Sequence, residues 1–532
     1  MNVQLTEMDW RHDQSGRLVE TQNLLESDTS DNESVTSKDN KPDPTSYEDA
    51  LEATGNGIFN YLLTVICGWA VSSDAIEIMS LSYVLPSTTC DFNISEYYVA
   101  ILNASMFVGM LIGGYMWGII ADEIGRRKVL LFSLTLNGVA GLVSSVAQEY
   151  WLFTSMRLIS GIGVGGSVPV VFSYFIEFQP KKRRGAMVSL LASFWMSGTI
   201  VAAGLAWFII PYTHIDVHLQ NFAYTNWRLY LSVCVIPSLS SVIFFFFLPE
   251  SPKFLLSIGN ESEALAILKL IYKKNHTRAY GHKYQVFSLR SSKDFSSSKH
   301  SFTQSTITGK LKHTMKNTAS LFKNPLLYNS AALMVISFTL SFGYYGLSMW
   351  FPSMFDKIEK YGGSICSPGK PTNTTFNLTC QEPDKDIYFD GFLTSVSNLP
   401  GNILSMLLVD RIGRKILLVV SMVISGLSVF FIWFVKTKVQ SLALSCLFGG
   451  ISVIGWNSLD TISSEIFPTQ LRSTGLGVQT ATLRIGAILG NLFFGILINA
   501  QCAIPMLLTS GLLLLGGLLA IKLPDLTGKD LS

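Results

Sequence analysis

The chain has 532 residues, of which 48% are hydrophobic and only 14% are charged, and its mean hydropathy is +0.37. Soluble domains carry nearer a quarter charged residues, so this composition excludes a soluble enzyme. The formal net charge of +2 hides an uneven distribution: residues 1–57 hold 13 acidic and 4 basic side chains, whereas residues 249–327 hold 13 basic and 4 acidic ones.

Twelve apolar stretches of roughly 19 to 28 residues are long enough to cross a hydrocarbon core of about 30 Å as helices. They predict an all-α membrane protein with twelve transmembrane helices in two pseudo-symmetric six-helix bundles. We place the spans at residues 58–86, 98–120, 129–147, 151–176, 186–211, 228–248, 328–351, 388–409, 415–435, 441–463, 474–498 and 503–522.

The segments between and around these spans complete the predicted organisation. Residues 1–57 are expected to be an acidic, disordered cytosolic tail, and residues 249–327 a basic cytosolic linker between the bundles at 58–248 and 328–522. The second bundle contains a long loop at 352–387, and residues 523–532 form a second short tail. The opposite charges of tail and linker permit a contact, but we expect two separately solvated segments.

The orientation follows from the basic residues, which gather at one end of the predicted helices. By the positive-inside rule this end faces the cytosol, and an even number of spans places both termini there too. The opposite side carries sequons that glycosylation can reach only in the lumen or outside the cell, at Asn93, Asn373 and Asn377. On that oxidising side we expect a disulfide between Cys366 and Cys380, with pairings to Cys90 or Cys502 left open.

One cluster of charged residues occurs twice, 288 positions apart, and its aspartate and glutamate are 55 positions apart in each copy. Such an internal repeat is typical of secondary transporters built from two like halves. Charge-assisted bonds among these side chains would gate the cytosolic helix ends, holding them together in one state; the alternative is helix capping with membrane anchoring. The gating residues are Asp122, Arg126, Glu177 and Arg184 in the first copy and Asp410, Arg414, Glu465 and Arg472 in the second.

Two acidic residues lie near the middle of the first span, where a charge costs about 2.5–3.5 kcal/mol on insertion scales. The spacing of Asp74 and Glu77 puts both carboxylates on one helical face, which should point into the bundle. This pair suits proton or cation binding. The alternative is a structural carboxylate paired with an arginine or a helix end.

A second set of intramembrane residues combines aromatic rings with charge. Trp456 and Asp460 are four residues apart and share a helical face, so an indole and a carboxylate lie together. Aromatic and acidic side chains suit a cationic or hydroxylated organic solute, although such rings are also common in packing. The candidate solute-binding residues are Trp195, Tyr344, Tyr345, Trp456, Asn457, Asp460 and Arg484.

The glycines between Gly161 and Gly166 lie inside a predicted span below Arg157. We interpret them as a site of close helix packing rather than a nucleotide-binding loop. The sequence shows no nucleophile–base pair, metal-ligand cluster or nucleic-acid motif, so we expect neither an enzyme nor a cofactor, metal or nucleic-acid site.

Several motifs resemble the major facilitator superfamily, and within it the sugar and organic-ion porters. The run Gly118-x-x-x-Asp122-x-x-Gly125-Arg126-Arg127 and the run Pro249-Glu250-Ser251-Pro252 are similar to signatures of that superfamily, with a weaker second copy in which Met406 replaces the first glycine. A closer resemblance, over about residues 50–525, is to the synaptic vesicle glycoprotein 2 family. It rests on Phe194-Trp195-Met196, Ser341 to Leu347, Leu399-Pro400-Gly401-Asn402-Ile403 and Trp456-Asn457-Ser-Leu-Asp460.

The resemblance implies that the positions of Trp195, Trp456 and Asp460 line a central ligand cavity, and that Asp74 and Glu77 are the charge pair of the first helix. The chain departs from the family's vertebrate members in its 352–387 loop, which is too short for their lumenal domain of pentapeptide repeats. A function of that domain is therefore not expected here.

The acidic tail contains Glu20-Thr-Gln-Asn-Leu24-Leu25, which fits an acidic dileucine sorting motif. Leu24 and Leu25 would fill an apolar pocket of a clathrin adaptor while Glu20 meets a basic one. An exocytic partner at the tail is the other expected contact.

Together these features predict a secondary active transporter of a small organic solute. It would work by alternating access, with coupling to protons or another cation, in a synaptic or secretory vesicle membrane or the plasma membrane. The alternative is a transporter-fold vesicle protein that acts in regulated exocytosis or trafficking with little transport.

Overall fold

The computed structural model describes most of the chain. The described residues are 45–212, 217–219, 222–276, 284–289, 315–316, 318–361, 363–364, 367–368, 384–435, 437–468, 471–498 and 503–524, without the side chains of residues 218–219, 359–364, 367–368 and 410.

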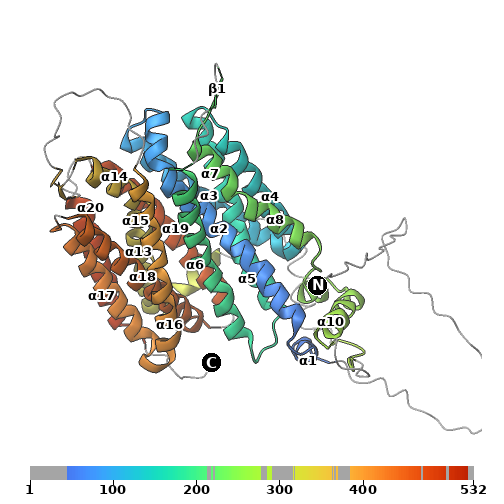
Figure 1. Ribbon diagram of the computed structural model, residues 1–532. Coiled ribbons are helices and arrows are strands. Elements are labelled where there is room, and N and C mark those ends of the chain that lie inside the picture. Colours follow the sequence, from blue (N-terminus) through green and yellow to red (C-terminus); the bar gives the residue numbers. More distant parts are fainter. Residues whose placement is uncertain are drawn as a thin grey trace, which may run out of the picture. The chain divides into compact units, whose positions relative to one another are not determined.

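Twelve described stretches are helical, long and apolar enough to cross a membrane, as the sequence predicts. In the first half (Figure 1), the membrane helices are α2 (Ile58–Asp91), α3 (Glu96–Ile124), α4 (Arg126–Ser145), α5 (Tyr150–Ile176), α6 (Arg184–Ile209) and α7 (Asn226–Cys234) with α8 (Ile236–Phe246). Shorter elements accompany them: α1 (Tyr47–Ala53), the antiparallel strands β1 (Val217–Leu219) and β2 (Phe222–Tyr224), α9 (Pro252–Ser257) and α10 (Glu261–Asn275).

The second half repeats this arrangement. Its membrane helices are α13 (Leu327–Ser348), α15 (Lys385–Val396) with α16 (Asn398–Ile412), α17 (Arg414–Ile432), α18 (Lys438–Ile466), α19 (Arg472–Leu497) and α20 (Ala503–Ile521). The 352–387 loop begins with a further helix, α14 (Phe351–Tyr361), which is followed by the two-residue strands β3 (Gly363–Ser364) and β4 (Ser367–Pro368).

Two of the expected spans are each built from two helices, and a proline explains each break. Pro237 follows the end of α7, and Pro400 lies in the first turn of α16. Proline has no backbone N–H to donate to the preceding turn, and its ring collides with the carbonyl there. The helical hydrogen-bond ladder is therefore interrupted within these two spans.

The duplicated charge cluster corresponds to a duplicated turn. Gly125 ends α3 with φ +106°, and Gly413 ends α16 with φ +94°. Glycine alone adopts such angles without strain, because it has no β-carbon. At Gly125 a β-carbon would also overlap the Glu250 carboxylate. We call the end of the bundles that carries these turns the basic face, and the opposite end, which carries Asn93, the sequon face.

Glycines also set the distance between α3 and α5. A β-carbon on Gly109 or Gly113 would overlap the backbone of α5, and one on Gly161 or Gly165 would overlap the backbone of α3. The two helices are therefore in direct backbone contact, as small residues allow in membrane bundles. The glycine run at 161–166 is a packing feature, as the sequence analysis proposed.

Residues 45–57 are in contact with the basic face, which differs from the expected pair of solvated segments. Tyr47 donates to the backbone oxygen of Glu177 at 2.5 Å, and Tyr284 donates to that of Ala50 at 2.6 Å. Arg184 pairs with Glu48 at 2.7 Å. Ala50 and Leu51 are fully buried, so a small apolar contact supports these polar ones. The attraction between opposite charges and the burial of Ala50 and Leu51 therefore outweigh the separate solvation of tail and linker that the composition suggested.

We predict that Tyr47→Phe loosens α1. The substitution removes one hydrogen bond worth about 1 kcal/mol, so the amide protection of residues 47–53 in hydrogen exchange should fall about fivefold. Tyr61→Phe is the control, because Tyr61 is 51% exposed and lies on the first turn of α2. Unchanged protection in Tyr47→Phe would show that this hydroxyl does not hold α1 in place.

Candidate functional site

The aromatic side chains proposed from the sequence meet in the second half of the molecule. The ring centroids of Tyr344 and Tyr345 on α13 lie 5.8 and 5.9 Å from the ring of Trp456 on α18, and both contacts are edge-on. Phe107 of α3, which the sequence analysis missed, lies 4.9 Å from Tyr345 and so extends the aromatic wall into the first half. Such pairs add about 0.5–1.5 kcal/mol each beyond burial, so the wall is rigid.

Asp460 lies one helical turn beyond Trp456 on α18, and its side chain is exposed. It lies close enough to Tyr345 to interact with it electrostatically. Arg484 on α19 is partly buried and lies close enough to interact with both Tyr345 and Asp74. The Asp460 carboxylate, the Arg484 guanidinium and the ring of Tyr345 thus lie in one region.

Asp74 of α2 lies on the first-half side of this region and is fully buried. One of its oxygens accepts a hydrogen bond from Ser167 of α5 at 2.7 Å. Its other oxygen, Oδ1, is buried and has no hydrogen-bond partner among the described residues. A carboxylate with one unsatisfied oxygen in an apolar interior is poised to take up a proton or a cation.

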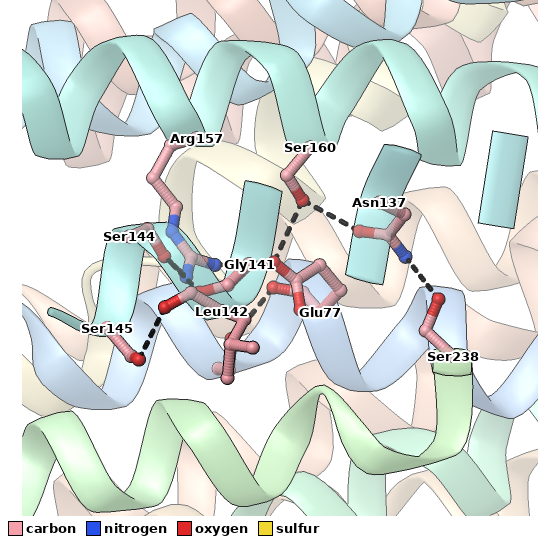
Figure 2. A network of polar contacts seen from close by, with 10 residues as sticks. Glu77, Asn137, Gly141, Leu142, Ser144, Ser145, Arg157, Ser160 and Ser238 are labelled. Atoms are coloured by element: carbon pink, nitrogen blue, oxygen red, sulfur yellow. Dashed lines mark hydrogen bonds and ion pairs between the residues drawn. The ribbon is translucent and has the colours of Figure 1, made fainter. Parts of the chain in front are cut away.

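Glu77, one turn further along α2, has a different environment (Figure 2). Arg157 of α5 donates to Glu77 Oε1 at 2.6 Å, and neither side chain is more than 2% exposed. Ser160 lies 2.8 Å from the same oxygen, and Ser144 accepts from the Arg157 guanidinium. The two carboxylates of α2 are therefore not equivalent, because Glu77 has a buried countercharge and Asp74 has a hydroxyl.

The remaining solute-binding candidates are placed around this centre. Asn457 donates to Asn402 of α16 at 2.8 Å, which links two helices of the second half. Trp195 of α6 is partly buried and packs against both of the large apolar clusters of the molecule. Arg157, Ser160 and Asn137 were not among the candidates. Polar residues within two apolar spans were the available signal for them.

The gating candidates form ion pairs within each half. Arg126 pairs with Asp122 at 3.1 Å and with Glu177 at 3.4 Å, and Arg414 pairs with Glu465.

The second arginine of each copy, Arg184 in the first and Arg472 in the second, has different partners in the two halves. Arg184 bonds to Glu48 and to the Gln179 backbone, whereas Arg472 donates to the Phe467 backbone at 3.4 Å. The Asp410 side chain lies outside the described part.

On the sequon face the two halves touch. Tyr83 of α2 lies 3.0 Å from Ser395 of α15, and Trp207 of α6 stacks on Phe392 at 5.6 Å. Lys357 of α14 pairs with Glu96 of α3 at 2.8 Å. A cavity of about 40 Å³ lies beside Tyr83 and Tyr344, with room for a few water molecules. The two halves are thus in direct contact on this side.

Several predicted sites lie outside the described residues. These are the sorting motif Glu20, Leu24 and Leu25, the sequons Asn373 and Asn377, and the cysteines Cys366 and Cys380. Asn93 is exposed on the sequon face at φ +48°. Cys90 takes part in a disulfide, a possibility that the sequence left open; the other described cysteines, Cys67, Cys234 and Cys446, are free thiols.

Comparisons with known proteins agree with this architecture. The model of the Sugar (and other) transporter family matches residues 31–358, and that of the Major Facilitator Superfamily matches residues 391–530. The fold is similar to that of the partially occluded, inward-open xylose transporter XylE from E. coli, with a TM-score of 0.66 and 18% identity over 89% of this chain and 99% of that one. The chain is thus a major facilitator protein.

Curated relatives narrow the assignment. The chain is 33% identical to synaptic vesicle glycoprotein 2C of Mus musculus, over 90% of this chain and 80% of the relative. It is 31% identical to synaptic vesicle glycoprotein 2B of Homo sapiens, over 90% and 85%, and to 2A of Rattus norvegicus, over 91% and 80%. The chain belongs to the synaptic vesicle glycoprotein 2 family.

We predict that Glu177→Gln stabilises the protein at neutral pH. Burial raises the pKa of Glu177 above its ordinary value, and Arg126 offsets this only in part. Glu177 then binds a proton more tightly in the folded chain than in the unfolded chain. The free energy of unfolding therefore falls as the pH rises from the ordinary pKa of glutamate towards the raised pKa of Glu177. The variant cannot ionise, and its melting temperature should exceed that of the native protein at pH 7.5.

This gain should disappear at about pH 4, where the native glutamate is protonated in both states. Glu149→Gln, which replaces an exposed carboxylate, is the control and should behave like the native protein at both pH values. A lower melting temperature for Glu177→Gln at pH 7.5 would mean that the attraction of Arg126 outweighs burial.

Proposed function

We propose that this protein is a secondary active transporter of a small hydroxylated or cationic organic solute. The observation that carries the proposal is the exposed Asp460 carboxylate one helical turn from Trp456, whose ring contacts those of Tyr344 and Tyr345. Rings offer flat apolar faces to a solute, while the carboxylate binds its hydroxyl or ammonium groups.

Alternating access would move this site from one side of the membrane to the other. The sequon-face contacts of Tyr83, Trp207 and Lys357 join the halves, whereas the basic-face pairs of Arg126 and Arg414 lie within single halves. This asymmetry supports a state that is closed on the sequon face. In the opposite state, the sequon-face contacts would part and the basic-face clusters would approach each other.

Coupling to protons or another cation would use the two carboxylates of α2. Asp74 has an oxygen without a partner among the described residues and interacts with Arg484 of the other half. Glu77 has its own countercharge in Arg157. A proton on either carboxylate changes the charge balance between the halves, which is how ion binding biases a two-state equilibrium.

The proposed location is a synaptic or secretory vesicle membrane, with the basic face and both termini in the cytosol. The names of the relatives and the positive-inside rule support this. The acidic tail would recruit a clathrin adaptor or an exocytic partner. The same relatives favour a second function, in which the fold serves exocytosis or trafficking with little transport.

Flux into proteoliposomes separates the two functions. Vesicles with and without the protein are first compared for their metabolites, and the solutes that differ are then tested by counterflow. We predict that Trp456→Ala weakens solute binding at least tenfold, a loss of about 1.4 kcal/mol, because the ring that contacts both Tyr344 and Tyr345 disappears. Trp151→Ala is the control, since Trp151 is 62% exposed on α5.

Unaltered solute affinity in Trp456→Ala would show that the rings of Tyr344, Tyr345 and Trp456 do not form the binding site. Absence of flux for every solute tested, together with an exocytosis defect on depletion, would favour the second function.

Coupling has its own test. We predict that Asp74→Asn abolishes the stimulation of uptake by an inward proton gradient but retains solute exchange without a gradient, since the amide cannot carry a proton across. Glu149→Gln, at an exposed position, should keep both activities. Gradient-driven uptake that survives in Asp74→Asn would exclude this carboxylate from coupling.

A further inference from the structure

Three fully buried polar side chains lie where the two halves meet. Asn103 of α3, Asn491 of α19 and Trp350, between α13 and α14, are all 0% exposed. Both amide atoms of Asn103, the amide oxygen of Asn491 and the indole nitrogen of Trp350 have no hydrogen-bond partner among the described residues. Leaving four polar atoms unpaired in an apolar interior is costly, so their grouping needs an explanation.

Contacts one turn away place these side chains in one seam between the halves. Helix α3 packs against α19 (Figure 1), and a β-carbon on Gly495 would overlap Ala100 and lie 3.0 Å from the ring of Trp350. Asn103 comes three residues after Ala100, and Asn491 four residues before Gly495, so each asparagine shares a helical face with its contact residue. Because α3 and α19 run in opposite directions, both asparagines lie one turn closer to the basic face, at the same level.

The next turn of α3 also touches the second half. Phe107, four residues after Asn103, has its ring 4.9 Å from that of Tyr345 on α13. Ala100, Asn103 and Phe107 therefore form one stripe along α3, and the second half contacts the residue on either side of the asparagine. The seam thus lies between the aromatic rings of the candidate site and the sequon face.

The unpaired atoms include both donors and acceptors. Asn491 donates its amide nitrogen to the backbone oxygen of Ala487 at 2.9 Å, and since a carbonyl only accepts, the unpaired atom of Asn491 is its oxygen. Asn103 lacks a partner at both amide atoms, so turning its amide over changes nothing. The seam therefore offers two acceptors, the oxygens of the two asparagines, and two donors, the amide nitrogen of Asn103 and the indole nitrogen of Trp350. None of the four is hydrogen-bonded to another.

We propose that this seam binds a single water molecule that bridges the two halves. Buried waters typically make about three hydrogen bonds to polar groups that have no other partner, and a water can donate two and accept two. The close approach of Gly495 to Ala100 leaves no room there for a larger molecule. Asn103 belongs to the first half, and Asn491 and Trp350 belong to the second, so the water fastens the halves on the sequon side.

The bridge stabilises the state in which the halves touch on the sequon face, because the groups of the seam are then paired. A variant that leaves some of these groups unpaired destabilises that state alone, since solvent reaches them once the halves part. Asn103 and Asn491 are thus positioning residues that set how often the sequon face opens. The inference rests on the proposed movement of the halves and not on which solute they carry.

The bound water is tested by the Raman spectrum of Trp350, which requires no transport. The indole band that reports N–H hydrogen bonding is isolated as the difference between the native protein and Trp350→Phe, both in lipid. Because this N–H has no partner among the described residues, a hydrogen-bonded band indicates the water. Asn103→Leu and Asn491→Leu should move the band to the position of a free N–H. A free N–H in the native protein, or no movement in either variant, would overturn the proposal.

The fastening of the halves is tested by the distance between two spin labels. They are attached through p-acetylphenylalanine, which leaves the cysteines untouched, at the exposed positions of Glu149 in the first half and Val439 in the second. Asn103→Leu should raise the fraction with the long, open distance about tenfold over the native protein. The reason is that Trp350 and Asn491 then lack their shared partner in the closed state only.

Ser105→Ala is the matched control, because it removes a buried hydroxyl of α3 that bonds to the backbone oxygens of Leu102 and Thr154 within the first half. Its open fraction should equal that of the native protein. If Asn103→Leu does not fold, Asn491→Leu carries the same expectation, and the native Trp350 band still decides whether water is bound.

The outcomes separate this inference from the proposed function. A lower open fraction in Asn103→Leu would mean that its amide is unpaired in the closed native state, which contradicts the bridge. Two distances whose fractions do not change in the variants would also contradict the bridge but leave alternating access standing. A single distance in every protein would refute the movement of the halves together with the bridge.

Discussion

The buried pair of Glu77 and Arg157 is the interaction on which the first bundle depends. It joins α2 to α5 at 2.6 Å in a part of the molecule that water does not reach. Loss of one partner would leave an uncompensated charge, which costs about 3–5 kcal/mol, so the register of these two helices is fixed. The direct backbone contact of α5 with α3 then passes this register to a third helix. The buried polar residues are therefore held by three helices, α2, α5 and α3, whose positions relative to one another are fixed.

The two halves share a fold but use different chemistry at the same levels. Glu77, Arg157, Ser160 and Asn137 give the first half a charged and hydrogen-bonded centre, whereas Tyr344, Tyr345 and Trp456 give the second half an aromatic one. On the basic face, Arg184 pairs with Glu48, whereas its repeat Arg472 donates to the backbone oxygen of Phe467. A duplicated scaffold with unlike interiors suits a protein in which one half responds to charge and the other binds an organic molecule.

Much of this arrangement could be predicted from the sequence, because length, hydropathy and the 288-residue repeat depend on local chain composition. The twelve spans follow from such patterns, and the repeated glycines mark the turns at Gly125 and Gly413. The grouping of Tyr344, Tyr345 and Trp456 was instead proposed from the shared face of Trp456 and Asp460 and from the family resemblance. The breaks at Pro237 and Pro400 were missed, since hydropathy averages over them. Side-chain partners were harder to predict. The spacing of Asp74 and Glu77 places them on one face but does not say that Glu77 pairs directly with Arg157, which is 80 residues away in the sequence.

Different partners also explain why Asp74 and Glu77 can have different roles. A carboxylate beside a fixed guanidinium keeps the local charge near zero while ionised, so its protonation leaves a net positive charge behind. Asp74 has no such neighbour within its own half, and Arg484, with which it interacts, belongs to the other half. If the halves separate at this level, as we propose for transport, Asp74 would lose that attraction, whereas Glu77 would keep Arg157. The two carboxylates, one helical turn apart, are therefore bound to different parts of the molecule.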